Sequence, residues 1–403
     1  FILTYDENDG YFDHVPPFVA PHPFKRSTGL VSKSINTLSD YVASKDQQSN
    51  KEHSRESSIG LGYRVPLVIA SPWSRGGWVN SQVFDHTSSL QFLEKFLSHK
   101  LKKKIEEPNI TSWRRAVCGD LSSAFRPYNG EKLDKPEFLD KKEFIESIHK
   151  AQFKNPPSNF RKLSGEEIEK INKAPYSSPH MASQEKGIRS SCSLPYELYV
   201  NEKLSDDKRS ISINFRCGRQ FFGASSAGSP FQVYAPGIYK NEIMKVWDYA
   251  VAAGEEVTDK WAIDEFENGN YHLNVYGPNG FFREFKGNSN DPDIELVCEY
   301  ESDLKRRDLA MGFPNILVNN NSKLLQTIEI TDNAYGHGNK VYPVKAQTGK
   351  KPKIIGISTF ESYNWYDFTV RIKGNKSFER RYAGRVETKE AGKTDPFMGR
   401  VKS

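Results

Sequence analysis

Four carboxylates and one imidazole lie close together near the start of the sequence, and these residue types are suited to chemistry. They are Asp6, Glu7, Asp9, Asp13 and His14. Adjacent acids without a basic partner repel each other, so this group favours a hard divalent cation with oxygen ligands. An acidic strand-to-loop turn, with Asn8, Asp9 and Gly10 as turn residues, is the alternative. The residues alone leave both interpretations open.

A second polar cluster contains another histidine. Asp85 and His86 precede an apolar segment, 87–97, whose spacing predicts a helix with a cap at Thr87 or Ser88. A helix N-terminus favours anions, so this pair could assist a negatively charged substrate. An ordinary polar cap would give the same pattern, and spacing alone favours that alternative for His86.

Each cluster follows an apolar run that is typical of a buried strand, 1–5 in one case and 65–70 in the other. Ligands of open α/β sheets bind at the carboxyl ends of the strands. We therefore expect these runs to be neighbouring parallel strands. His14 and His86 should then lie within about 10 Å of the Asp6 carboxylate.

Composition excludes some classes of protein. The 403 residues contain 57 Lys and Arg against 51 Asp and Glu, and this small excess does not indicate nucleic-acid binding. No run reaches the roughly 18 apolar residues of a membrane span. The four cysteines form no CxxC pair, so a zinc cluster is not expected, and one, two or no disulfides remain open.

The second half of the chain has a different texture. Short alternating runs with turn residues between them predict antiparallel β-sandwiches over 195–303 and 308–396. The two regions contain an internal repeat. The aligned pairs include Tyr271 with Tyr366, Arg283 with Arg380 and Gly287 with Gly384. The predicted fold is thus an α/β domain over 1–125, a helical and loop connector over 126–194, and two all-β sandwich repeats.

Several blocks, in this order, resemble the bacterial phosphocholine-preferring phospholipases C. The blocks start at residues 5, 62, 71, 84, 119 and 277 and read YDENDGYFDHVPP, GYRVP, SPWSRGGWV, FDHTS, GDLSSAF and GPNGFFREF. This family belongs with the acid-phosphatase branch of the alkaline phosphatase superfamily. The resemblance implies the C-terminal portion of an alkaline-phosphatase-like sheet domain.

The resemblance also implies an activity. Such enzymes are phosphoric diester hydrolases that cleave phosphatidylcholine or sphingomyelin into diacylglycerol or ceramide and phosphocholine. The expected partners are phosphocholine-containing lipids and a membrane surface, and the expected location is secreted or periplasmic. The alternatives are a phosphomonoesterase of the same superfamily and a non-catalytic module that attaches to a surface through the β-repeats.

Site roles follow residue by residue from the resemblance. Asp6 and Glu7 match the paired ligands of one divalent metal ion, calcium or another hard dication, and His14 and His86 match histidines beside the phosphoryl group. Asp13 and Asp85 are expected to lie just outside these site residues and to hold them in position. In this family the hydroxyl nucleophile lies upstream of the segment that matches residue 1. We therefore expect this chain to be the C-terminal part of a longer protein and to be inactive alone.

Aromatic residues near these positions suggest how choline is recognised. A quaternary ammonium cannot donate hydrogen bonds, so it is bound through aromatic faces. Trp73 and Trp78 follow the second apolar run, and Tyr11 and Phe12 follow the first. Each of them could instead pack its loop onto the domain. As a group they are the predicted substrate-binding residues.

Overall fold

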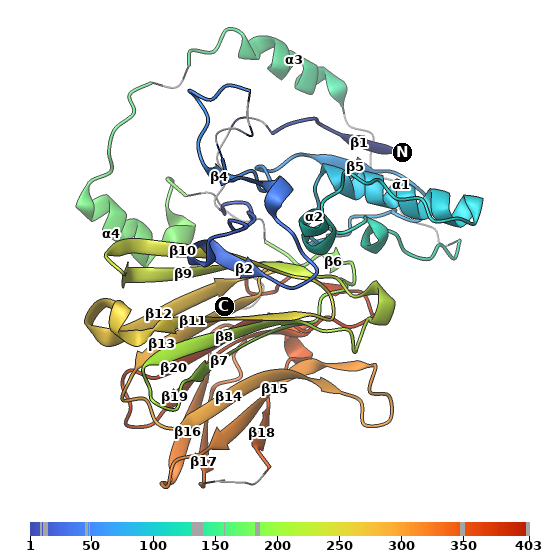
Figure 1. Ribbon diagram of the computed structural model, residues 1–403. Coiled ribbons are helices and arrows are strands. Elements are labelled where there is room, and N and C mark those ends of the chain that lie inside the picture. The colour runs from blue at the N-terminus through green and yellow to red at the C-terminus, as the bar shows by residue number, and fades with distance from the viewer. Residues whose placement is uncertain are drawn as a thin grey trace. The chain divides into compact units, whose positions relative to one another are not determined.

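The computed structural model divides into two compact units, residues Phe1–Arg126 with Ile188–Ser403, and residues Pro127–Gly187 (Figure 1). The residues that the structure describes are 1–8, 10, 15–44, 47, 49–130, 140–156, 158–181, 186–346 and 351–399. The bounds of the second unit, 127–187, are similar to those of the predicted connector, 126–194. The first unit joins the predicted α/β segment to the β-region.

The two apolar runs pair with each other, but not as predicted. Strand β1 (Ile2–Thr4) runs antiparallel to β5 (Leu67–Ile69), with Leu3 opposite Val68. Neither strand is buried: the exposed fractions of Leu3 and Val68 are 51% and 53%. The prediction of buried, parallel neighbours was therefore wrong. Apolar composition indicates a strand, whereas the direction in which the strand pairs and the extent to which it is buried depend on partners elsewhere in the sheet.

Two helices follow β5 along the chain. Helix α1 (His86–Leu101) begins after Asp85, which forms a reciprocal capping box with Ser88. Asp85 is therefore the cap, in place of the predicted Thr87 or Ser88. Helix α2 (Ser112–Val117) is capped by Thr111. Trp113 and Val117 of α2 pack in one cluster with Ala20, Ile35, Cys118 and Ala250, which anchors this segment to the β-region.

The N-terminal segment also contributes a strand to the large sheet of the β-region. Strand β2 (Gly29–Val31) runs parallel to β10 (Glu242–Val251). A Cβ atom on Gly29 would lie 1.7 Å from the main-chain oxygen of Asp248, so only glycine fits there. The smaller strands β3 (Tyr41–Val42) and β4 (Ser57–Ser58) pair with each other, and β6 (Ser190–Ser191) pairs with β21 (Gly392–Lys393).

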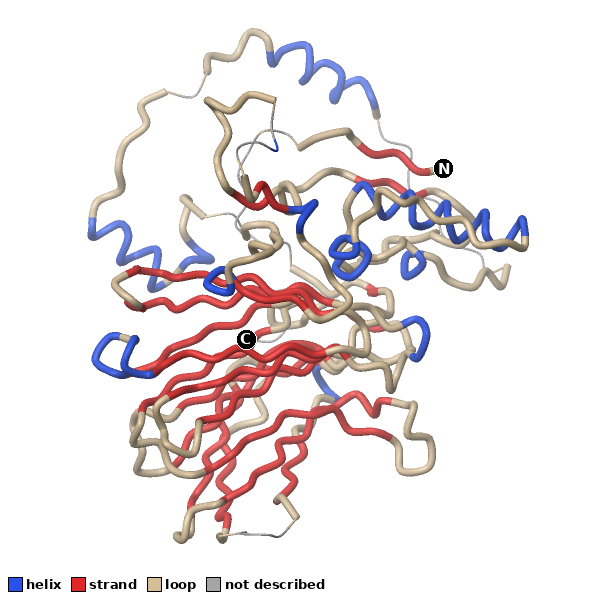
Figure 2. The backbone as a smooth tube through the Cα atoms, in the orientation of Figure 1, coloured by secondary structure: helices blue, strands red, loops and turns tan. Residues whose placement is uncertain are grey.

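Strands dominate the chain after residue 195 (Figure 2). They are β7 (Leu198–Leu204), β8 (Ser210–Cys217), β9 (Ser229–Tyr239), β10, β11 (Glu256–Ala262), β12 (Asn270–Tyr276), β13 (Phe282–Asn288), β14 (Ile294–Ser302), β15 (Ala310–Asn320), β16 (Gln326–Asp332), β17 (Asn339–Val344), β18 (Lys353–Gly356), β19 (Trp365–Ile372) and β20 (Glu379–Arg385). Among the described residues, nine strands form one sheet in the order β17-β16-β19-β20-β13-β12-β9-β10-β2. Strands β11-β8-β7 and β14-β15-β18 form two smaller sheets of three strands in the same described part.

The predicted repeats are not separate sandwiches. Strand β13 of the first pairs with β20 of the second, so both belong to one sheet, and one hydrophobic cluster contains buried side chains from both. The prediction of two independent domains was wrong, because two adjacent hairpins can join their free edges and thereby satisfy both strands.

The repeated hairpins nevertheless have matching local structure. Tyr271 lies opposite Gly287 in the β12–β13 hairpin, and Tyr366 lies opposite Gly384 in the β19–β20 hairpin. Each tyrosine hydroxyl then accepts a hydrogen bond from an arginine of the other hairpin: Arg380 donates to Tyr271 at 2.7 Å and Arg283 to Tyr366 at 3.0 Å. The aligned residues thus make reciprocal contacts across the β13–β20 junction.

The second unit carries helices α3 (Lys141–Ala151) and α4 (Gly165–Lys173). Asp140 caps α3, and Ser164 caps α4 in a capping box with Glu167. Within the residues described, we find no helix that combines the length and the apolar character needed to cross a bilayer. All four cysteines of the chain lie in its described part, and all are buried and free of disulfides.

Candidate active site

A cleft of about 540 Å³ in the first unit gathers several of the predicted residues. Its walls come from the segment after β1, the loop before β5 and the start of α1. Four of the predicted site residues line it: Asp6, Glu7, Asp85 and His86. Residues nearly eighty positions apart therefore meet here, although the strands that carry them are antiparallel.

The imidazole of His86 is fixed to the loop after β1. Its Nε2 lies 2.9 Å from the main-chain oxygen of Asp6. A carbonyl oxygen can only accept, so Nε2 carries the proton of this hydrogen bond. In the neutral ring, Nδ1 then keeps a lone pair. His86 is also the first residue of α1, where the helix dipole favours an anion beside it.

Asp85 is held by an arginine from α2. The Arg114 guanidinium pairs with Asp85 Oδ2 at 2.5 Å and with Asp40 Oδ1 at 3.2 Å, and it donates to the main-chain oxygen of Gly60 at 3.0 Å. Asp40 is only 1% exposed, and burial raises the pKa of its carboxyl above the usual value. Arg114 thus connects the N-terminus of α1 to a buried carboxyl group.

The carboxylates of Asp6 and Glu7 are exposed. Within the described part of the chain, neither carboxylate has a hydrogen-bond or ion-pair partner. Two such oxygen donors suit a hard dication, which needs about six ligands or more. The described residues contain no group of three or more His, Cys, Asp or Glu side chains placed to hold a metal ion. Asp6 and Glu7 therefore fit part of a coordination shell, and the described residues do not complete it.

The other predicted residues lie elsewhere. His14, Asp13, Tyr11 and Phe12 fall outside the residues that the structure describes. Trp73 and Trp78 are described, but they are not among the residues that line the cleft. The Arg126 guanidinium lies over the Trp78 ring, 4.0 Å from its centroid, so one face of that ring is occupied.

Sequence reasoning missed the aromatic side chains that do line the cleft. They are Phe18, Tyr63 and Phe84. Tyr63 and Phe84 lie inside two blocks that carry the family resemblance, and Phe84 directly precedes Asp85. Their positions beside predicted site residues were the available signal. Alternation of polar and apolar residues predicts side-chain direction in strands, but it does not predict which side chains of an irregular loop point into a cleft.

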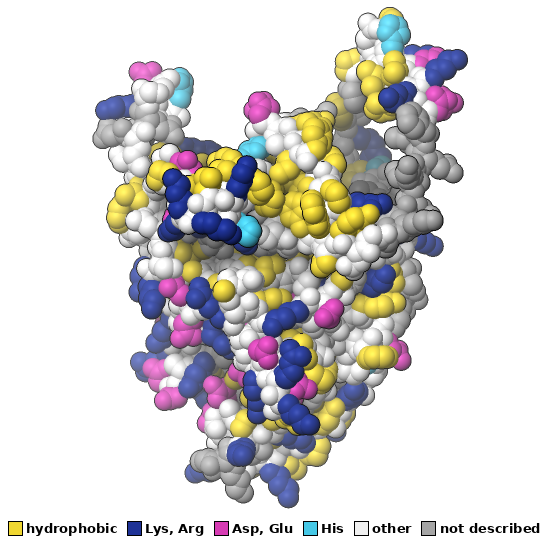
Figure 3. All heavy atoms as spheres, turned by 90° about the vertical axis from the view of Figure 1, so that its right-hand side faces the viewer, with side chains coloured by type: hydrophobic (Ala, Val, Ile, Leu, Met, Phe, Trp, Pro, Cys, Tyr) yellow, Lys and Arg dark blue, Asp and Glu magenta, His cyan; other side chains and the backbone are white. Residues whose placement is uncertain are grey.

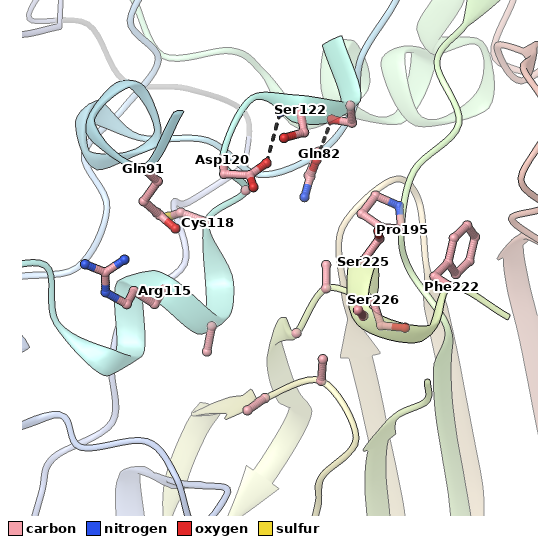
Figure 4. Close-up of a pocket in the computed structure, with 18 of the residues that line it drawn as sticks. Gln82, Gln91, Arg115, Cys118, Asp120, Ser122, Pro195, Phe222, Ser225 and Ser226 are labelled. Carbon is pink, nitrogen blue, oxygen red and sulfur yellow. Dashed lines mark hydrogen bonds between the residues drawn. The ribbon is translucent and has the colours of Figure 1, made fainter. Parts of the chain in front are cut away.

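A second cavity, of about 860 Å³, lies between α1, α2 and the loop before β9 (Figure 4). Four of the five charged side chains that line it are in ion pairs: Lys95 with Asp120 at 2.8 Å, Arg115 with Glu94 at 2.9 Å and Lys389 with Asp308 at 3.3 Å, Arg219 being the fifth. Burial raises the pKa of the Cys118 thiol well above its usual range, so this cysteine is not a thiolate nucleophile. The smaller cleft is therefore the better catalytic candidate.

Comparison with known proteins identifies the two parts of the first unit. Residues 1–98 match a sequence model of the phosphoesterase family, and residues 190–288 match one of the bacterial phospholipase C C-terminal domain. The chain is 35% identical to the non-hemolytic phospholipase C of Pseudomonas aeruginosa over 99% of this chain and 52% of that protein.

Two further relatives agree. Identity is 33% to the non-hemolytic phospholipase C of Burkholderia pseudomallei, over 98% of this chain and 50% of that protein. It is 31% to the hemolytic phospholipase C of Pseudomonas aeruginosa, over 99% and 51%. The chain thus spans about half the length of these curated relatives. From its phosphoesterase segment to its C-terminal β-region, it is similar in sequence to bacterial phospholipases C.

Proposed function

We propose that this chain is part of a phospholipase C that hydrolyses the phosphodiester of phosphatidylcholine or sphingomyelin. The products are diacylglycerol or ceramide and phosphocholine. One observation carries the proposal: the contact between His86 Nε2 and the Asp6 carbonyl. This contact joins His86 to the loop that carries Asp6 and Glu7, whose carboxylates have no partner among the described residues, and all three side chains line one cleft in a chain related to phospholipases C along its length.

In this proposal His86 donates a proton to the leaving oxygen. The protonated ring donates from Nδ1, because Nε2 is already directed at the carbonyl of Asp6. The same contact stops the ring from rotating away. The start of α1 favours the phosphoryl group beside the ring. His14 is proposed as a second histidine at this group, and Asp13 as a residue that supports it.

Asp6 and Glu7 are proposed as two ligands of one divalent metal ion, calcium or another hard dication. When bound, such an ion neutralises phosphoryl oxygens and lowers the pKa of a hydroxyl nucleophile. We propose that the nucleophile and the remaining ligands come from a part of the full-length protein that corresponds to the half of the relatives that this chain does not match. Asp85 is proposed as a positioning residue, since Arg114 and the cap of α1 hold it.

Choline recognition is proposed for aromatic faces at the mouth of the cleft. Phe18, Tyr63 and Phe84 line it, so they are added to the four aromatic residues predicted from the sequence. Trp78 could use only the face that Arg126 leaves open. From the similarity of this chain to bacterial phospholipases C, we also propose that the protein is secreted or periplasmic.

The proposed function is tested with the full-length protein that contains this chain. Hydrolysis of p-nitrophenylphosphorylcholine and of p-nitrophenyl phosphate is compared under the same conditions. A phospholipase C cleaves the choline diester and leaves the monoester almost untouched. Preference for the monoester would instead support a phosphomonoesterase, and no hydrolysis of either would support a non-catalytic surface module.

A further inference from the structure

Helix α3 carries an apolar face whose side chains are exposed in the part of the chain that the structure describes. Every described residue from 140 to 156 is exposed. The exposed fractions of Phe144, Ile145 and Ile148 are 66%, 61% and 58%. These three side chains share one side of the helix, because residues three and four positions apart are neighbours on its surface. Phe153 and Phe160, just after α3, are 72% and 87% exposed.

Such a helix is not expected to be stable alone. Isolated helices shorter than about 12–15 residues are marginal in water, and most helices in proteins are stabilised by packing of an apolar face. Helix α3 has 11 residues and buries none of them. Its cap and the ion pair of Lys150 with Glu146 contribute little because they are exposed to solvent. We therefore expect the apolar face of α3 to pack on another surface.

The charges around α3 indicate which kind of surface. Between residues 140 and 162, the described residues include six Lys and Arg and three Asp and Glu, an excess of three positive charges, of which Arg161 pairs with Glu167 just beyond this range. Lys150 lies on the side of α3 away from the apolar face, Lys141 and Lys142 border that face at its N-terminal end, and Lys154, Arg161 and Lys162 follow the helix. Apolar rings beside basic side chains fit the interface of a bilayer that contains anionic lipids.

Helix α4 lacks this combination. Its residues include three Glu and two Lys, an excess of one negative charge, and both lysines pair along the helix, Lys170 with Glu166 and Lys173 with Glu169. Of its apolar residues, Ile168 is 45% exposed. The apolar and basic features together belong to α3 and the residues up to 162. This segment also lies between the two regions that match family models, which end at 98 and begin at 190.

We propose that α3 and the segment to residue 162 bind the surface of a phospholipid bilayer, with Phe144, Ile145 and Ile148 inserted among the acyl chains near the headgroups. The helix lies in the plane of the interface and its lysines contact anionic lipid. This inference rests on the proposed function, since a phospholipase C must reach a substrate that is part of a membrane. It assigns attachment to α3, which lies outside the ranges of the two matched family models.

Vesicle binding tests this proposal without requiring turnover. The protein is co-sedimented with vesicles of phosphatidylcholine and a minority of phosphatidylglycerol, with the divalent ion chelated. The wild type is expected to bind, and a Phe144→Asp/Ile148→Asp variant to bind at least about tenfold more weakly. Phe360→Asp is the matched control: Phe360 is 92% exposed but lies in the first unit, and this variant should bind like the wild type.

Two outcomes would overturn the proposal. One is equal vesicle binding by the wild type and the double variant. The other is a fall in melting temperature of the double variant without vesicles, with unchanged vesicle binding, which would show that α3 packs on protein. Hydrolysis of p-nitrophenylphosphorylcholine, a soluble substrate, is measured on the same variants. It should not change, and its absence in all of them would count against the proposed function alone.

A fluorescent reporter tests insertion directly. The second unit contains no tryptophan, so Phe144→Trp places a single one there. Vesicles with bromine-labelled acyl chains should quench the fluorescence of this variant more than that of the wild type, whose six tryptophans give the background. Equal fractional quenching of the two proteins would contradict insertion of the α3 face.

Discussion

The Nε2 of His86 lies 2.9 Å from the main-chain oxygen of Asp6, and this contact joins the start of α1 to the loop after β1. It orients the only described histidine that lines the cleft, whose walls also carry Asp6 and Glu7. The proposed chemistry depends on this orientation, because the proton must be available at Nδ1.

Replacing His86 should therefore remove catalysis. His86→Ala in the full-length protein is expected to lower kcat/KM about 100- to 10,000-fold, which is the usual contribution of a general acid or base. His99→Ala, in the last turn of the same helix, is the control and should leave kcat/KM unchanged. Full activity of His86→Ala would exclude this residue from proton transfer.

Neutralising the acidic pair should weaken metal binding. Asp6→Asn and Glu7→Gln each remove one anionic oxygen donor from the proposed site, so divalent-ion affinity should fall at least about tenfold. Isothermal titration with calcium and with manganese measures this in the full-length protein. The exposed Asp264 lies far along the chain, and Asp264→Asn should bind like the wild type. Unchanged affinity in both site variants would place the metal elsewhere.

Arg114 should matter for stability as well as activity. Arg114→Met leaves the buried Asp40 carboxyl without its cation, which costs about 3–5 kcal/mol for a buried pair. The Asp40→Asn/Arg114→Met double variant should recover part of this loss. Urea unfolding measures both.

The control for Arg114 lies next to it. Arg115→Met breaks a pair with Glu94 and should cost less, without changing the reaction. Because Asp85 is proposed as a positioning residue, Arg114→Met should lower kcat more than it raises KM. Equal costs and equal kinetics for the two arginine variants would contradict a special role for Arg114.

Asp248 should make stability fall as pH rises. Burial raises the pKa of its carboxyl from 3.8 to about 7, while Gln232 donates to it at 3.2 Å. The folded state therefore holds this proton across a range in which the unfolded state has lost it. Its stabilising contribution is complete below pH 3.8 and is lost as pH rises through about 7.

Thermal melting between these pH values measures the effect. Asp248→Asn can still accept the hydrogen bond from Gln232 and cannot titrate. The melting temperature of the wild type should fall relative to that of Asp248→Asn as pH rises. Parallel curves for the two proteins would show that the pKa of Asp248 is not raised by folding.

Local features of the site were predictable from sequence, and its surroundings were not. The position of Asp85 and His86 at a helix start follows from apolar spacing after a polar pair, and the structure has α1 there. The antiparallel direction of β1 and β5 does not follow, because apolar composition carries no information on pairing direction. Arg114 was missed for a similar reason: its partners Asp40 and Asp85 are far from it in sequence.

The β-region shows the same limit on a larger scale. The repeat that aligns Tyr271 with Tyr366 is real, since both tyrosines occupy matching places in their hairpins. What the alignment could not show is that the hairpins join edge to edge through β13 and β20. Sequence similarity identifies equivalent elements, whereas their assembly depends on long-range contacts such as the one between Arg380 and Tyr271.

The most direct test of the proposed function is the identity of the products formed from phosphatidylcholine. The full-length protein is incubated with phosphatidylcholine vesicles and a divalent ion, and phosphorus NMR follows the phosphorus-containing product. Cleavage on the glycerol side of the phosphorus gives phosphocholine and diacylglycerol, and His86→Ala should abolish both. Phosphatidic acid and choline as the products, or phosphocholine release that His86→Ala leaves intact, would contradict the account.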